Sequence, residues 1–146
     1  MTRGKTDAMR DLEHEMGVLI RRIRRVMVLR AQFVHPDLNA VSYSVLTNLA
    51  DTGPKRATEI ADTFAIDKGA VSRQVQQLVD LDLVDRTPDP NDGRASILQL
   101  SALGRSRLDA VNRNRRKFLD DRLAEWSAAD LSDFVGWLSR YNASLD

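Results

Sequence analysis

The feature that most constrains the fold is a pair of short strands in the middle of the chain, joined by a turn-rich segment. Strands are predicted over residues 83–87 and 95–100, where Leu98 and Leu100 share one face. The segment between them, residues 88–93, contains only Pro, Asp, Asn and Gly, which are residue types that dominate turns. The sequence therefore predicts a β-hairpin with a protruding tip.

Two helices are predicted directly before this hairpin. Residues 59–64 have the pattern of a short helix, and Ala65-Ile66 forms a turn. Asp67 can cap the next helix, because its carboxylate can accept a hydrogen bond from a free backbone N–H, and this helix continues to about Leu81. A short helix, a tight turn, a second helix and a hairpin together make the pattern of a winged helix-turn-helix.

Longer helices are predicted on both sides of this unit. Apolar residues recur at helical spacing over residues 7–30, and a second helix is predicted to end near Asp51. Residues 101–125 are predicted to form a long, charged helix, and Ser127 with Asp130 fits a capping box that begins a terminal helix. The predicted fold class is therefore mainly α with a small β-hairpin wing.

The composition argues against several classes of chemistry. The chain has no cysteine, so disulfides, thiolate zinc sites and thiol nucleophiles are excluded. It contains no catalytic Ser/His/Asp motif, P-loop or dinucleotide fingerprint, and its two histidines lack metal-ligand spacing. We therefore expect no enzyme, no catalytic residue, no metal and no other cofactor. No apolar run approaches the roughly 18 residues of a membrane span and no signal peptide is visible, so we expect a cytoplasmic protein.

The exposed face of the predicted helix at 68–81 is unusual. A helical wheel places Val71, Val75 and Leu78 on the buried arc. The opposite face and its flanks carry small residues, amides and one guanidinium, namely Gly69, Ala70, Ser72, Arg73, Gln76 and Gln77. Surface helices favour paired acids and bases, whereas arginine and glutamine match base edges and phosphates. From this face alone, a solvated surface and a nucleic-acid contact remain equally open.

The hairpin carries cations in a position that suits a DNA-binding wing. Arg94 directly follows the tip at Asp92-Gly93, and Arg86 lies on the opposite strand. An arginine there would project beside the reading helix, where the negative potential of an adjacent minor groove favours it. Residues 36–104 nevertheless contain six basic and ten acidic side chains. Any contact with a polyanion must therefore depend on where the cations lie.

The segment from Thr58 to Gly104 resembles the MarR family of bacterial transcriptional regulators. The resemblance rests on four stretches, Glu59–Asp62, Leu78–Arg86, Asp89–Arg94 and Leu98–Gly104. The wing of this family typically reads acid, any residue, arginine, which Asp92-Gly93-Arg94 matches. The chain departs from the family pattern at Asp82, where a glycine usually ends the recognition helix.

This resemblance implies a sequence-specific, DNA-binding regulator of transcription, most often a repressor, that acts as a homodimer on a palindromic operator of double-stranded DNA. The predicted DNA-binding residues are Arg56, Lys68, Gly69, Ala70, Ser72, Arg73, Gln76, Gln77, Arg86 and Arg94. Within one compact domain overall, the predicted parts are an N-terminal dimerisation helix (1–35), the winged helix-turn-helix (36–104) and C-terminal dimerisation helices (105–146).

The resemblance also implies a small aromatic or phenolic ligand that relaxes the hold on DNA. The residues predicted to border its site are Phe33, His35, Tyr43 and Arg86. The acidic centre keeps a second function open, a winged-helix module for protein–protein contact without strong DNA binding. A shift assay with competitor DNA at near-physiological salt discriminates between the two functions.

Overall fold

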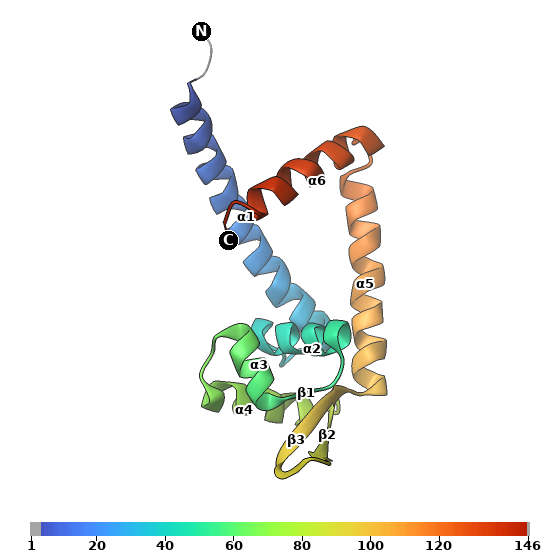
Figure 1. Cartoon of the computed structure of the whole chain (residues 1–146). Helices are drawn as coiled ribbons and strands as arrows, with labels where there is room; N and C mark the ends of the chain where they lie inside the picture. The colour runs from blue at the N-terminus through green and yellow to red at the C-terminus, as the bar shows by residue number, and fades with distance from the viewer. Residues whose placement is uncertain (1–3, 146) are drawn as a thin grey trace. The chain divides into compact units, whose positions relative to one another are not determined.

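The computed structural model describes residues 4–145, which form six α-helices and one three-stranded sheet (Figure 1). In chain order the elements are α1 (Lys5–Val34), α2 (Ala40–Thr52), β1 (Lys55–Arg56), α3 (Ala57–Phe64), α4 (Lys68–Asp80), β2 (Val84–Asp89), β3 (Asp92–Leu100), α5 (Ala102–Arg122) and α6 (Ala128–Asn142). This architecture confirms the predicted class. The chain divides into two compact units, one up to Val111 and one from Asn112.

The core of the first unit lies where α2, α3 and α4 meet the sheet and the end of α1. Its largest fully buried side chains include Leu46 on α2, Ile60 on α3, Leu78 on α4 and Leu98 on β3. The predicted buried arc of α4 is confirmed, because Val71, Val75 and Leu78 are all at most 2% exposed. The second half of the helix-turn-helix is therefore fixed to the core along one side, and the opposite side is left to solvent.

The sheet is antiparallel in the order β1-β3-β2 (Figure 1). Its two long strands extend further toward the tip than predicted, because β2 continues to Asp89 and β3 begins at Asp92, with an irregular register at Pro88/Asp89. The third strand, β1, was not predicted. It consists of two residues, too few to show the alternation by which a strand is recognised in a sequence.

Within residues 4–145, two non-glycine residues adopt left-handed backbone conformations, and both lie at the ends of helices of the helix-turn-helix. Ala65 has φ 50° after α3, and Asp82 has φ 55° after α4. At the end of α4, the N–H of Leu83 donates to the carbonyl of Leu78 over 2.9 Å, and the N–H of Asp82 donates to that of Val79 over 3.0 Å. This pair of bonds is the Schellman arrangement, in which glycine is the usual left-handed residue.

A short polar joint connects this left-handed turn to the start of α5. The hydroxyl of Ser101 donates to the carbonyl of Asp82 over 2.6 Å and accepts from the N–H of Gly104 over 2.9 Å. The N–H of Ser101 donates to the carbonyl of Leu83 over 3.1 Å. Ser101 therefore caps α5 and, through the same side chain, ties it to the end of α4.

The second unit contains the part of α5 that follows Val111 and all of α6. The predicted capping box is confirmed, because the N–H of Asp130 donates to the Ser127 hydroxyl over 3.1 Å and the N–H of Ser127 donates to the Asp130 carboxylate over 2.9 Å. The pKa of Asp130 lies below its ordinary value because the Ser127 hydroxyl, over 2.6 Å, and then the Ser127 N–H donate to its carboxylate. The terminal helix ends at Asn142, so Leu145 lies beyond it. No helix within residues 4–145 has the length and apolar character needed to cross a membrane.

Candidate nucleic-acid interface

The exposed side of α4 presents most of the side chains predicted to contact DNA. Lys68, Gly69, Ser72, Arg73 and Gln76 are exposed, and Ala70 is half-buried. Asp67 caps the helix as predicted, because its carboxylate accepts from the N–H of Ala70 over 3.0 Å. The small residues Gly69, Ala70 and Ser72 on this surface allow close approach to a groove.

Close packing at the start of α4 explains why a glycine follows the capping region. A Cβ on Gly69 would lie 2.9 Å from the Oδ2 atom of Asp67, the same oxygen that accepts from Ala70. Any larger residue at position 69 would therefore push against the cap. The absence of a side chain here also exposes the backbone at the helix N-terminus, where N–H groups suit a phosphate oxygen.

One polar contact on this face escaped the prediction. The amide of Gln76 donates to the Oδ1 atom of Asp80 over 2.7 Å, so an acid shares the face that was predicted to be neutral or basic. The spacing of four residues identifies such a pair in a sequence. Gln76 must release this bond in order to donate to a base edge.

The structure corrects the orientation of Gln77, which the wheel had placed on the exposed face. Its Nε2 atom donates to the carbonyl of Asp37 over 2.8 Å, and its Oε1 atom accepts from the buried hydroxyl of Ser42 over 3.0 Å. Gln74, one turn earlier, accepts from the same hydroxyl over 2.6 Å and from Asn39 over 2.8 Å. Gln77 is therefore half-buried against α2, because α2 covers a flank of α4 as well as its core side.

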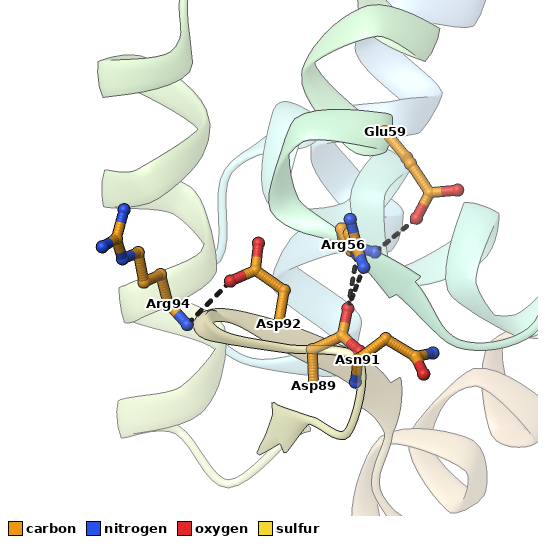
Figure 2. A network of polar contacts seen from close by, with 6 residues as sticks. All are labelled: Arg56, Glu59, Asp89, Asn91, Asp92 and Arg94. Carbon is orange, nitrogen blue, oxygen red and sulfur yellow. Dashed lines mark hydrogen bonds and ion pairs between the residues drawn. The ribbon is translucent and has the colours of Figure 1, made fainter.

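The wing presents Arg86 on β2 and Arg94 on β3, both with exposed side chains. At the tip, the Oδ1 atom of Asp92 accepts from the backbone N–H of Arg94 over 3.0 Å. Figure 2 shows the guanidinium of Arg94 pointing away from that carboxylate. Among the described residues it forms no ion pair, so its charge is available to a ligand.

Arg56, the remaining predicted contact, has a partner inside the protein. Its Nε atom donates to the Oδ2 atom of Asp89 over 2.5 Å, and its Nη2 atom forms an ion pair with the same oxygen (Figure 2). The side chain of Asp89 is only 2% exposed, whereas that of Arg56 is 39% exposed. The pKa of Asp89 lies below its ordinary value because the N–H of Asn91 and then the guanidinium of Arg56 stabilise the carboxylate. Sequence reasoning missed Asp89 because an aspartate in a turn-rich segment is usually exposed.

The four residues predicted to border a ligand site lie in different environments. Tyr43 belongs to the buried core at 4% exposure, whereas Phe33 on α1 is 53% exposed. His35 lies after α1, and its Nδ1 atom accepts from the N–H of Asp37 over 3.2 Å. An open groove of about 540 Å³ lies instead in the second unit. Its lining residues are Glu125, Trp126, Asp130, Asp133, Phe134 and Trp137, none of which was predicted.

Comparison with known proteins agrees with this geometry. The MarR family model matches residues 37–95. The chain is 33% identical over 134 residues to the uncharacterized HTH-type transcriptional regulator YxaD of Bacillus subtilis, which covers 92% of each chain. It is 30% identical over 103 residues to the HTH-type transcriptional repressor NicR of Pseudomonas putida, covering 69% of this chain and 65% of NicR.

Solved structures share the fold. RV1404 from Mycobacterium tuberculosis aligns with a TM-score of 0.80 at 21% identity, over 98% of this chain and 96% of that one. A mutant of MarR from Escherichia coli, complexed with operator DNA, aligns with a TM-score of 0.63 at 21% identity, over 87% and 93% of the two chains.

Proposed function

Because this chain belongs to the MarR family of HTH-type transcriptional regulators, we propose that it is a sequence-specific repressor that binds a palindromic DNA operator as a homodimer. The observation that carries the proposal is the exposed face of α4 together with the unpaired guanidinium of Arg94 on the wing. As a DNA-binding regulator rather than an enzyme, it would act where the chromosome lies, in the cytoplasm.

In the proposed complex, α4 enters the major groove and the wing reaches the neighbouring minor groove. Arg73 is the one guanidinium on the exposed face of α4, and arginine is suited to donate two hydrogen bonds to a guanine edge. Lys68 at the start of the helix is placed to approach a phosphate. Arg94 carries its charge into the minor groove, where negative potential favours it.

The homodimer is supported by apolar surface that a single chain leaves open to water. On α1, Leu12, Leu19, Ile20 and Ile23 are between 39% and 50% exposed. On and after α6, Phe134, Val135, Trp137 and Leu145 are between 50% and 67% exposed. Large exposed apolar patches mark interaction sites, so we assign dimerisation to residues 1–35 and 105–146. We assign DNA contact to residues 36–104.

A palindromic operator follows from two-fold symmetry. Two recognition helices must lie about 34 Å apart in order to enter successive turns of the major groove. A small aromatic or phenolic ligand that favours another spacing would weaken binding. Phe33, His35 and Arg86 are accessible to such a ligand, whereas Tyr43 must leave its buried position to reach one.

A protein–protein module is the second candidate, and the acidic balance of residues 36–104 favours it. The two functions are separated by a shift assay with a duplex selected from a randomised library, challenged with competitor DNA at near-physiological salt. Specific retention of the selected duplex supports the repressor. Complete loss to competitor supports the module.

The wing gives the assay a matched pair of variants. Arg94→Ala should weaken binding, and the negative slope of log K against log salt should become less steep by about 0.9 per monomer, because one cation near a phosphate is lost. Arg10→Ala removes an exposed arginine from α1 that pairs with Asp7. Because α1 is assigned to dimerisation, sedimentation first establishes that this variant associates as the wild type does, and both quantities should then be unchanged. Equal affinity and slope for Arg94→Ala and the wild type would refute the role of the wing.

A further inference from the structure

The contact between Arg56 and Asp89 joins two parts of the chain that are distant in sequence. Arg56 lies at the start of α3, where its backbone N–H donates to the Glu59 carboxylate over 2.7 Å. Asp89 lies at the end of β2, next to the irregular register that precedes the tip. Figure 2 shows their side chains in contact between the start of α3 and the hairpin. The helix-turn-helix is thereby attached to the wing by an interaction between side chains as well as through the backbone of β1.

The carboxylate of Asp89 also shapes the tip itself. Its Oδ1 atom accepts from the N–H of Asn91 over 2.8 Å, while its Oδ2 atom is held by Arg56. Three residues after Asp89, the carboxylate of Asp92 accepts from the N–H of Arg94 over 3.0 Å. Two carboxylates therefore connect α3 to Arg94. Asp89 holds the backbone at Asn91, and Asp92 holds the backbone at Arg94.

Burial decides how this pair is used. A charge that is 2% exposed is stabilised only by its hydrogen-bond partners, so Asp89 depends on the guanidinium. The Nε and Nη2 groups of Arg56 both contact the same Asp89 oxygen, Oδ2. A phosphate contact through the Nε and Nη2 groups would have to break these bonds and leave a buried carboxylate without its cation.

We propose that Asp89 and Arg56 are positioning residues that hold the wing where Arg94 can enter the minor groove, and that Arg56 does not itself contact DNA. This inference rests on the proposed function of DNA binding. It replaces the predicted role of Arg56 and assigns a DNA-binding role to an acidic residue that cannot approach a phosphate.

A positioning role for Asp89 and an effect of its charge alone predict opposite changes in DNA affinity when this acid is removed. Removing an acid from a DNA-binding surface should strengthen binding to a polyanion. Asp89→Asn should instead weaken it about tenfold, because displacement of the wing loses one contact of ordinary size. The matched control is Asp85→Asn, which removes an exposed acid from the same strand and should bind at least as tightly as the wild type.

The decisive measurement is a double-mutant cycle between the Arg56–Asp89 pair and Arg94. Binding of the selected duplex is measured over a salt series for the wild type, Asp89→Asn, Arg94→Ala and the double variant. If Asp89 acts through Arg94, Asp89→Asn lowers the salt slope as Arg94→Ala does, and the double variant is no weaker than Arg94→Ala alone. Independent effects would add on a logarithmic scale.

Arg56→Lys provides the second variant. It keeps the charge but loses the fork that holds one oxygen with two groups, so it should reproduce Asp89→Asn and also be silent in the Arg94→Ala background. It therefore carries the test if Asp89→Asn does not fold, as melting curves would show. A direct phosphate contact by Arg56 predicts near wild-type affinity for Arg56→Lys.

The outcomes separate the two levels of the proposal. Tighter binding by Asp89→Asn, or effects of Arg56→Lys and Arg94→Ala that add, would overturn the positioning role and leave DNA binding intact. Absence of any selected duplex for the wild type would overturn the proposed function itself. Non-additive losses of affinity, with Asp85→Asn binding at least as tightly as the wild type, support the positioning role of Arg56 and Asp89.

Discussion

Replacement of Gly104 by alanine should destabilise the protein through a clash with backbone. Gly104 is buried in the first turn of α5, and a Cβ placed there would lie 2.2 Å from the carbonyl oxygen of Leu83 and 2.8 Å from the Cδ1 atom of Leu100. The methyl group would have to move away by roughly 1 Å or more to reach van der Waals contact. The side chain of Leu100 can rotate, whereas the Leu83 carbonyl is held by the N–H of Ser101.

The magnitude follows from these contacts. Overpacking of a tight site typically costs about 1–3 kcal/mol. Displacement of the Leu83 carbonyl also weakens its bond from Ser101, which is worth about 1 kcal/mol. Alanine recovers part of this loss through its helix propensity, up to about 1 kcal/mol over glycine. We therefore expect Gly104→Ala to lower the free energy of unfolding by about 1–3 kcal/mol and the melting temperature by about 2–12 °C.

The assay is urea unfolding followed by circular dichroism, at one protein concentration because an associating chain has a concentration-dependent stability. Gly17→Ala is the matched control. Its Cβ would meet only the flexible end of Arg21 at 3.4 Å, so it should stabilise α1 by up to about 1 kcal/mol. A Gly104→Ala protein within about 0.5 kcal/mol of the wild type, the range of ordinary surface substitutions, would refute the close approach of α5 to Leu83.

Three further predictions concern the recognition helix, its end and the wing. Arg73→Ala should cost about 1–3 kcal/mol of operator binding and relax sequence preference, and equal losses on selected and random duplexes in a shift assay would limit Arg73 to a phosphate contact. Asp82→Gly should raise the free energy of unfolding by about 0.5–1 kcal/mol, because glycine adopts the left-handed conformation without strain, and an unchanged urea midpoint would contradict this. The lowered pKa of Asp89 means that its ionised form stabilises the folded state above the ordinary pKa of 3.8, a contribution that is lost as pH falls through the lower folded value. Urea midpoints across this range should therefore fall less steeply for Asp89→Asn than for the wild type.

Local patterns were sufficient to predict most of the fold. The buried arc of α4 follows from the periodicity of Val71, Val75 and Leu78, and the caps at Asp67 and Ser127 follow from single residues at fixed spacing. These features depend on neighbours within one or two helical turns. A sequence displays such neighbours directly.

Contacts between distant segments were not predictable in the same way. Gln77 lies on the exposed side of a wheel drawn around one buried arc. Its amide nevertheless donates to the carbonyl of Asp37, before α2, and its oxygen accepts from Ser42 on α2. Asp89 and Arg56 are separated by 33 residues, and nothing in either local pattern indicates that the two side chains meet. The predicted hairpin was correct, but the attachment that holds it in place was not visible in the sequence.

The buried hydroxyl of Ser42 has a single hydrogen atom, but two glutamine oxygens lie within reach of it. Neither amide can turn over to supply a donor of its own, because Gln77 already donates to the carbonyl of Asp37 and Gln74 already accepts from Asn39. One of the two oxygens therefore lacks this hydrogen at any moment. A hydroxyl hydrogen can rotate about its C–O bond, so it can alternate between two acceptors almost one turn apart on α4. Either bond is sufficient to keep a hydrogen bond between Ser42 of α2 and α4.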